Sequence, residues 1–187
     1  GEQLKGYLDQ PSTTALEDRL NKLDINLLEG NSGEINLFIE DWIEEAVNVL
    51  DRGYILTIDY GSEAAELYSQ KKSRGTLTCF YKHSQNDDPY INIGRQDITA
   101  QVDFTTLIQK GWDMNCKPLG YVAQNLFLSN LGLRRFMSQV SAIGLEQIQR
   151  DSNRMGMLDL IRPGGLGDFK VLVQSKNAPG YPLWGIH

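Results

Sequence analysis

The residues best placed to do chemistry follow a short apolar segment that runs from Tyr54 to Ile58. A near-continuous apolar run of this length predicts a strand buried on both faces of a parallel sheet. Ligands of open α/β sheets bind outside the carboxyl ends of the strands, so we expect a site at Asp59, Tyr60 and Gly61. Asp59 has an alternative use, because an aspartate after a strand often caps the following turn.

A second candidate group surrounds His83, which lies in a polar stretch with Asp87 and Asp88 close behind it. A carboxylate could hold the imidazole as a general base, and a solvent-exposed loop histidine is the alternative. Cys79 precedes His83 by four residues. A structural zinc site needs four ligands, however, and no second Cys/His pair lies nearby, so we expect no metal site.

Other patterns give no sign of nucleophilic or phosphate-binding chemistry. The segment Gly164-Gly165-Leu166-Gly167 is expected to join a helix to a strand, whereas phosphate-binding loops run from a strand to a helix. We therefore interpret it as a turn. There is no Gly-x-Ser-x-Gly motif, and neither Cys79 nor Cys116 carries a recognisable signature, so a hydrolase triad is not indicated.

Apolar periodicity predicts the elements that position these groups. The expected helices are 14–23, 34–50, 104–110, 124–130, a longer helix with a core-facing stripe from Leu133 to Ile148, and 155–161. The expected strands are 54–60, 116–122 and 168–174. We expect Asp103 to cap the helix 104–110, Gly111 to end it, and Gly53 to end the helix 34–50.

The stretch 62–102 is long and polar, with only short apolar pieces. A connection of this length within a compact domain usually has a function or carries small elements of its own. We expect a lid or substrate loop there, within a single domain that spans residues 1–187.

Composition excludes several classes of protein. The chain has 187 residues, 41% hydrophobic and 22% charged, with a net charge of -6, which disfavours nucleic acid as a partner. We expect no membrane association, because no apolar run approaches the ~18 residues that span a bilayer. Two cysteines cannot form a disulfide framework, so a reducing compartment such as the cytoplasm is expected. No methionine precedes Met114, which indicates a removed initiator or a fragment.

A series of short motifs in register resembles the MidA family of S-adenosylmethionine-dependent methyltransferases. The similarity covers roughly Glu34 to Val173. Its motifs are Arg52-Gly53-Tyr54, Ile58-Asp59-Tyr60-Gly61, Arg74-Gly75-Thr76-Leu77, His83, Gly94, Asp97-Ile98-Thr99-Ala100, Val102-Asp103-Phe104, Gln124, Phe127-Leu128, Gly132, Met157-Leu158, Pro163, Gly167 and Phe169. Many short matches in one order are more specific than any single motif.

The resemblance implies an α/β, Rossmann-like class I methyltransferase fold: a mostly parallel sheet, an antiparallel last strand and helices on both faces. It implies an enzyme that uses S-adenosylmethionine to methylate a protein substrate. Arginine is the expected acceptor, because the family includes a mitochondrial assembly factor for respiratory complex I that methylates an arginine. For a eukaryotic protein, the mitochondrial matrix is then an alternative location to the cytoplasm.

Two departures from the family pattern bear on activity. The family's glycine-rich cofactor motif belongs to the N-terminal half, and no such motif occurs in this sequence. The chain therefore resembles the C-terminal half, in which 54–60, 116–122 and 168–174 would be the fifth, sixth and seventh strands. Gln101 stands where the family usually has a histidine.

Methyl transfer requires a nucleophile held in line with the methyl group, and carboxylates suit the orientation of a guanidinium. The resemblance implies catalytic roles for Asp59, Asp97 and His83. It implies substrate contacts for Tyr60, Gly61, Arg74, Thr99 and Asp103. Structural alternatives exist for several of them: Asp97 as a turn residue, Asp103 as a helix cap, and Arg74 as the ion-pair partner of a carboxylate.

The alternative function is a non-catalytic protein-binding or assembly module, which the missing glycine-rich motif favours. Cutting a doubly wound sheet in half leaves an apolar strand edge exposed. We therefore also expect the chain to form a homodimer.

Overall fold

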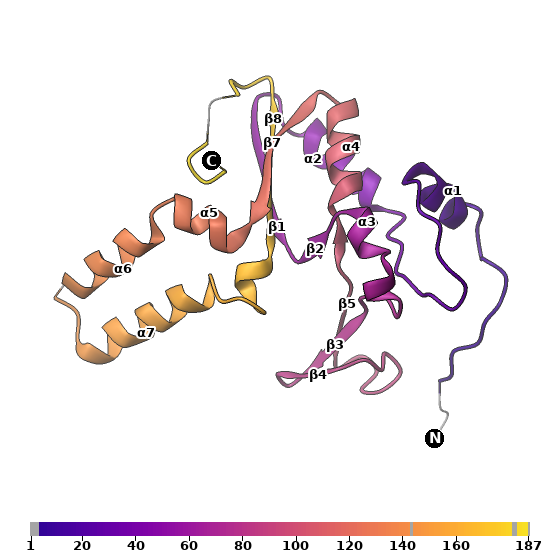
Figure 1. Ribbon diagram of the computed structural model, residues 1–187, viewed down its shortest axis with the longest axis horizontal. Helices are drawn as coiled ribbons and strands as arrows, with labels where there is room; N and C mark the ends of the chain where they lie inside the picture. Colours follow the sequence, from indigo (N-terminus) through magenta and orange to yellow (C-terminus); the bar gives the residue numbers. More distant parts are fainter. Residues whose placement is uncertain (1–3, 143, 181–182, 187) are drawn as a thin grey trace. The chain divides into compact units, whose positions relative to one another are not determined.

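The computed structural model describes residues 4–142, 144–180 and 183–186 (Figure 1). The chain divides into two compact units. The first comprises residues 1–40 and 62–106, and the second comprises residues 41–61 and 107–187. Along the sequence, the second unit is thus interrupted once by a segment of the first.

The second unit is built on a three-stranded sheet with the order β1-β8-β7. Its strands are β1 (Gly53–Asp59), β7 (Cys116–Ala123) and β8 (Lys170–Lys176). β8 is antiparallel to both neighbours, which confirms the expected antiparallel last strand. The expected mostly parallel sheet is not found among the described residues. β1 and β7 run in the same direction, but β8 lies between them, so they do not pair.

Burial distinguishes the central strand from the edge strand of this sheet. Residues 171–175 of β8 are all buried. β1 alternates between half-buried and exposed positions, with Tyr54, Leu56 and Ile58 exposed. The prediction that this strand is buried on both faces is therefore wrong. β1 is an edge strand of the sheet. The described residues leave the face with Tyr54, Leu56 and Ile58 uncovered.

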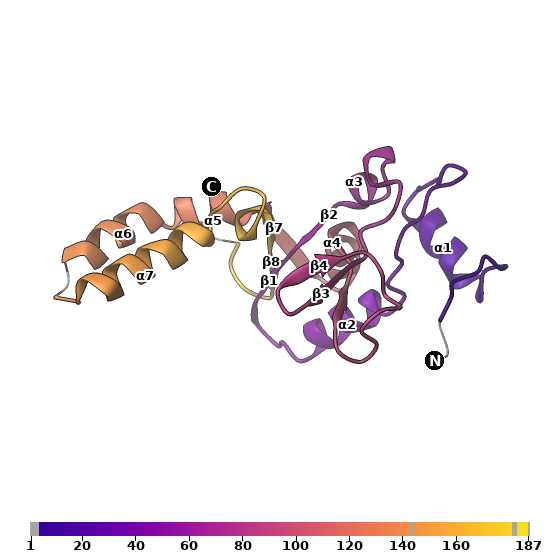
Figure 2. The same ribbon diagram turned by 90° about the horizontal axis from the view of Figure 1, so that it is seen from below.

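Helices flank the sheet on both sides (Figures 1 and 2). On one side are α2 (Ile39–Asn48) and α4 (Phe104–Asp113), both of which begin in the first unit. The Lys176 ammonium donates to the Val47 carbonyl of α2 at 2.8 Å, and the Gln174 amide donates to the Leu107 carbonyl of α4 at 3.1 Å. On the other side is α5 (Gln124–Asn130). Gly185 lies close to the Phe127 ring of this helix.

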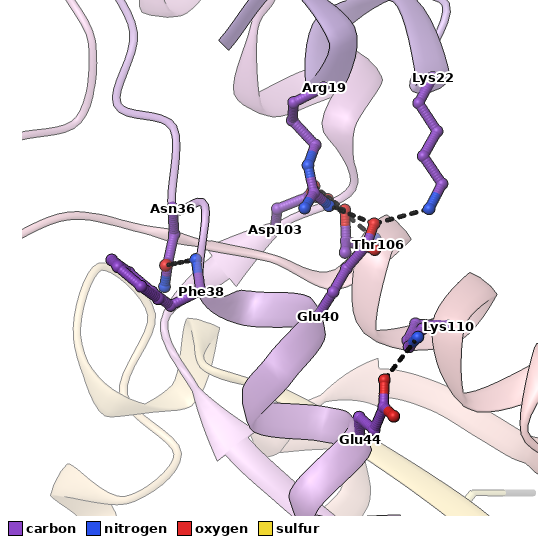
Figure 3. Close-up of polar contacts among 9 residues, drawn as sticks. All are labelled: Arg19, Lys22, Asn36, Phe38, Glu40, Glu44, Asp103, Thr106 and Lys110. Carbon is purple, nitrogen blue, oxygen red and sulfur yellow. Dashed lines mark hydrogen bonds and ion pairs between the residues drawn. The ribbon is translucent and has the colours of Figure 1, made fainter. Parts of the chain in front are cut away.

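The ends of α2 and α4 differ from the predicted ends. α2 begins at Ile39 rather than Glu34, after the Asn36 side chain accepts a hydrogen bond from the Phe38 N–H (Figure 3). α4 continues through Gly111 to Asp113, and Asn115, with φ +58°, follows its end. Gly111 is required for a close approach to β8, because a Cβ there would lie 2.0 Å from Gln174 Nε2.

Two helices replace the single long helix expected through Leu133 and Ile148. They are α6 (Leu133–Ala142) and α7 (Gln147–Asp159), and Figure 1 shows them side by side, leading away from the sheet. Gln149 accepts a hydrogen bond from the Glu146 N–H at the start of α7. The expected core stripe is wrong, since Phe136 is 62% exposed and Ile148 is 80% exposed. Ile143, which the stripe included, lies outside the described residues.

The first unit consists of short elements. They are α1 (Ala15–Lys22), α3 (Ala64–Leu67), a 3-10 turn η1 (Gln70–Lys72), the sheet β4 (Ser84–Asn86), β3 (Thr78–Tyr81) and β5 (Asp97–Thr99), and, apart from Gly61, the pair β2 (Gly61–Ser62) and β6 (Val102–Asp103). The stretch 62–102 thus carries elements of its own. None of the described helices is long and apolar enough to cross a membrane.

The core of the first unit forms around Ala64, Leu67 and Tyr68. Burial and the nearby carboxylates of Asp103 and Glu34 raise the pKa of Tyr68 to about 12, against an opposing effect of Arg19. The Tyr68 hydroxyl donates to the Glu34 carbonyl at 3.1 Å. The phenol is therefore held in its neutral form.

Stability is expected to fall at high pH through Tyr68. The folded state retains the phenol proton more strongly than the unfolded chain, whose tyrosine pKa is 10.0. The contribution, about 1–3 kcal/mol, is therefore complete below pH 10 and is lost as the pH rises to about 12. Urea unfolding of the wild type and of Tyr68→Phe across this range measures it. Parallel pH profiles for the two proteins would contradict the assignment.

Candidate functional site

The carboxyl end of β1 places Asp59, Tyr60 and Gly61 in the second unit. Asp59 is opposite Lys170 of β8, which is in turn opposite Ala123 of β7. The ends of β1 and β7 therefore flank the start of β8. Asp59 Oδ1 accepts the Tyr60 N–H at 2.8 Å, a bond to the next residue along the chain. Asp59 Oδ2 has no hydrogen bond to any described residue.

An aromatic pair lies next to this carboxylate. The rings of Tyr60 and Phe169 have centroids 5.6 Å apart with planes inclined by 50°. The Phe169 carbonyl accepts the Gln124 N–H at 2.8 Å, and the Gln124 amide donates to the Leu160 carbonyl at 2.9 Å. These bonds fix the backbone around Phe169. A carboxylate beside aromatic faces is a suitable environment for a guanidinium.

In the first unit, Glu34 holds the segment that contains Arg74, Gly75 and Thr76. Glu34 Oε2 accepts the Thr76 N–H at 2.7 Å and the Thr76 hydroxyl at 2.8 Å. Gly75 has φ +79°, and a Cβ there would lie 2.3 Å from Glu34 Oε1. The glycine thus allows the carboxylate to approach. Arg74 is exposed and has no ion pair with a described residue, so its expected carboxylate partner is not found.

Lys72, like Glu34, is a residue that the sequence analysis did not identify as a candidate for the site. Its ammonium donates to Ser62 Oγ at 2.8 Å and to Gln101 Oε1 at 2.7 Å, and Glu66 lies 3.6 Å away. The Gln101 N–H also donates to Thr76 Oγ1 at 3.0 Å. Gln101 therefore connects Lys72 with the segment that Glu34 holds. In the sequence, Lys72 and Glu34 have no pattern that separates them from surface charges.

Asp103 caps α4, as predicted. Its carboxylate accepts the Thr106 N–H at 3.2 Å and the Thr106 hydroxyl at 2.5 Å. Arg19 donates to Thr106 Oγ1 at 3.3 Å and pairs with Glu40 at 2.8 Å. Figure 3 shows these side chains converging from α1, α2 and the start of α4. Since Asp103 is buried with both oxygens used, the structure favours the cap over a substrate contact.

Removal of this cap is expected to destabilise the protein moderately. Asp103→Ala leaves the Thr106 N–H without its acceptor and should cost about 1 kcal/mol. Asp103→Asn keeps a side-chain oxygen at the same place and should cost only a few tenths. Urea unfolding of the two variants compares these values. An equal loss in both would mean that the negative charge, rather than the cap, stabilises the helix.

The other predicted residues of the first unit lie on its small sheet. Asp97 is exposed at the start of β5, opposite Phe80. Thr99 Oγ1 donates to the Thr78 carbonyl at 2.8 Å. His83 and Lys82 form the two-residue turn between β3 and β4, both with positive φ, as type I′ hairpins require. His83 is exposed, and no hydrogen bond joins it to a described carboxylate.

The predicted site residues therefore form two groups. Asp59, Tyr60 and Gly61 belong to the second unit. His83, Arg74, Asp97, Thr99 and Asp103 belong to the first. Asp59 and Tyr60, in the second unit, share a hydrogen bond. Asp97 and Thr99, in the first unit, share only the strand β5.

Thiol and metal chemistry receive no support from the described residues. Cys79 and Cys116 are buried free thiols, and burial raises the pKa of each. The carboxylates of Asp88 and Asp87 raise the pKa of Cys79 further. Neither cysteine is poised to act as a thiolate nucleophile. No cluster of three or more metal-binding side chains occurs in the described part of the chain.

Comparisons with known proteins identify relatives of the chain. A family model described as "Putative S-adenosyl-L-methionine-dependent methyltransferase" matches residues 1–122. Two crystal structures from Burkholderia thailandensis are similar to the chain, each with a TM-score of 0.79 and 29% sequence identity. No curated protein matches the sequence.

The two crystal structures extend beyond the region that matches this chain. One is of an uncharacterized protein, and the similarity covers 91% of this chain and 45% of that one. The other is of a "likely methyl transferase" bound to S-adenosyl-homocysteine, and the similarity covers 93% of this chain and 44% of that one. The chain thus spans less than half the length of these proteins.

Proposed function

Because the chain belongs to the methyltransferase family whose model it matches, we propose that it forms part of an enzyme that methylates a protein, with arginine as the acceptor. The observation that carries this proposal is the similarity over 93% of the chain to a structure bound to S-adenosyl-homocysteine, the product that remains of the cofactor after methyl transfer. Within it, the order of the short motifs supports the MidA family.

We propose that this chain supplies the acceptor side of the enzyme. When bound, S-adenosylmethionine supplies a methyl group that its sulfonium already activates. Among the described residues, no glycine-rich turn leads from a strand into a helix, so we assign none of them to the cofactor. The chain would therefore correspond to the C-terminal half of the methyltransferase fold, with the cofactor held mainly by other residues.

The acceptor would bind at the carboxyl end of β1. Asp59 Oδ2 is available to accept a guanidinium N–H while Oδ1 accepts the Tyr60 N–H. The Tyr60 and Phe169 rings offer aromatic surface for the planar guanidinium. Asp59 would orient the acceptor nitrogen and accept the proton that it releases. Asp97 and His83 are the other proposed catalytic groups, and their exposure leaves them accessible to a protein substrate.

The test is calorimetric titration of S-adenosylhomocysteine into the chain of residues 1–187 and into any longer product of the same gene. Binding by either supports the enzyme, and binding by neither would overturn the proposal in favour of an assembly module. The protein that binds is then supplied with labelled S-adenosylmethionine and a mixture of proteins. We expect label in methylarginine, and Asp59→Asn should slow its incorporation without weakening cofactor binding. Label confined to another side chain would exclude arginine as the acceptor.

A further inference from the structure

The two outer strands of the described sheet β1-β8-β7 differ in how they limit pairing with a further strand. β7 carries Lys117 and Pro118, and its register with β8 shifts between Pro118 and Gly120. A lysine, a proline and an irregular register keep an edge strand from pairing with another strand. β1 has none of these devices, since residues 54–58 are uncharged and its register with β8 is regular along all seven residues. The free edge of β1 therefore has the character of an interior strand.

One face of β1 is apolar and exposed beside this free edge. Gln174 of β8 donates to α4, and Ile55 is opposite Gln174, so Ile55 is on the side of the helices α2 and α4. Successive strand residues alternate between faces, which puts Tyr54, Leu56 and Ile58 on the other face. These three are 42%, 52% and 45% exposed, whereas the residues opposite them on β8 are buried. The exposure is thus confined to the strand with the free edge.

The helix α2 adds apolar side chains on the opposite face of the sheet. Its Ile43 is fully buried, and Glu44 pairs on one flank with Lys110 of α4 at 2.8 Å. Trp42 precedes Glu44 by two residues and lies on the opposite flank, and Val49 follows Trp42 by two turns on that same flank. Trp42 is 51% exposed and Val49 is 88% exposed. This flank faces away from α4, on the side of the sheet where β1 is the last described strand.

The occupant that fits this surface is a further strand with apolar cover on both of its faces. In each of the two similar crystal structures, more than half of the chain lies outside the match, so these proteins have a large part without a counterpart here. One of them is bound to S-adenosyl-homocysteine, whereas the described residues of this chain contain no glycine-rich turn from a strand into a helix. A second copy of this chain would supply neither the further part nor such a turn.

We propose that the free edge of β1 binds a strand from the part of the methyltransferase that holds the cofactor. This inference rests on the proposed function. The surface consists of the β1 edge with Tyr54, Leu56 and Ile58 on one face and Trp42 and Val49 on the other. β1 then becomes an interior strand of a larger sheet, and β7 remains an outer strand. The proposed acceptor site then follows an interior strand, where ligands of α/β sheets bind.

Thiol labelling tests which residues become covered. The larger protein is a chimera in which this chain replaces the matched region of the Burkholderia thailandensis protein bound to S-adenosyl-homocysteine. Leu56→Cys and Val49→Cys should react with a maleimide at least tenfold more slowly in the chimera than in the chain alone. Phe136→Cys, at an exposed position on α6, should react at the same rate in both. The native Cys79 and Cys116 are buried, and the unsubstituted proteins measure their background.

A charge placed on the same surface provides a second measurement. Leu56→Lys should leave the melting temperature of the chain alone unchanged, because this side chain is exposed there. In the chimera the lysine would be buried between strands and their cover, and the melting temperature should fall by about 5 °C or more. Phe136→Lys is the matched control and should leave both proteins unchanged.

Three results would overturn the proposal. The first is equal labelling of Leu56→Cys in the chain and in the chimera. The second is a chimera that does not fold, by circular dichroism, while the chain alone does. The third is labelling of Leu56→Cys that slows in the chain alone as its concentration rises, which would assign the surface to a second copy.

The proposed function is tested separately on the same chimera. The labelling needs no cofactor, and S-adenosylhomocysteine is titrated into the chimera by calorimetry. Slower labelling without cofactor binding would contradict the proposed function and leave the docking surface in place. Cofactor binding with unchanged labelling would contradict the docking surface and leave the proposed function in place.

Discussion

Gly111→Ala is expected to destabilise the protein by about 2–4 kcal/mol, even though alanine normally favours a helix. A Cβ at this position would lie 2.0 Å from Gln174 Nε2 and 3.2 Å from the Cys116 carbonyl oxygen. The fully buried Gln174 amide would have to leave its acceptors, the carbonyls of Leu107 and Cys116. A buried amide without partners is costly. Thermal unfolding should show a melting temperature lower by about 5–10 °C.

Gly156→Ala is the matched control, because it makes the same change within another helix. A Cβ at Gly156 would meet no atom within 4 Å. Helix propensity then acts alone, and the variant should be more stable than the wild type by up to about 1 kcal/mol. If Gly111→Ala also stabilised the protein, the close contact between α4 and β8 would be disproved.

Gly75→Ala is expected to cost about 2–3 kcal/mol through two separate effects. The backbone at φ +79° strains any residue that has a Cβ. The new methyl group would also displace the Glu34 carboxylate, which accepts two hydrogen bonds from Thr76. Urea unfolding measures the sum. Loss of this contact would also release Arg74 and Thr76 from their fixed positions in the proposed enzyme.

Gly30→Ala separates the two effects on Gly75. Gly30 has φ +83°, but a Cβ there would meet nothing within 4 Å, so only the strain of about 1 kcal/mol is expected. The excess cost at Gly75 should disappear when Glu34→Ala removes the carboxylate first. An excess that persists in that background would show that Glu34 does not hold the segment.

Local patterns predicted some of the elements closely. β1, β7 and α5 lie within one residue of their expected ends, because each is a run of one periodicity bounded by turns. The stripe from Leu133 to Ile148 led to a wrong prediction of one long helix, since its apolar spacing continues across the boundary between α6 and α7. A stripe of this kind indicates a helical face but does not show whether anything covers that face.

Contacts between distant residues account for what the sequence did not predict. Gly111 has the position of a helix terminator, and its role depends on Gln174, far along the chain. Glu34 and Lys72 have the appearance of surface charges, yet they bind Thr76, Ser62 and Gln101. The motif Arg74-Gly75-Thr76 was found by resemblance, whereas the side chain that holds it was not, because a single glutamate carries no spacing signal.

The position of β8 has a consequence for synthesis of the chain. β1 and β7 are both complete on the nascent polypeptide well before Lys170 emerges from the ribosome, yet among the described strands neither has a neighbour in its sheet until β8 is present. Pairing over such a long separation in sequence is slow. During this delay, Tyr54, Leu56 and Ile58 are exposed on an unpaired strand, which is a favourable target for chaperones that bind extended apolar segments. Translation that stops before β8 leaves β1 and β7 without the strand that joins them in the described sheet, and we expect its product to be degraded.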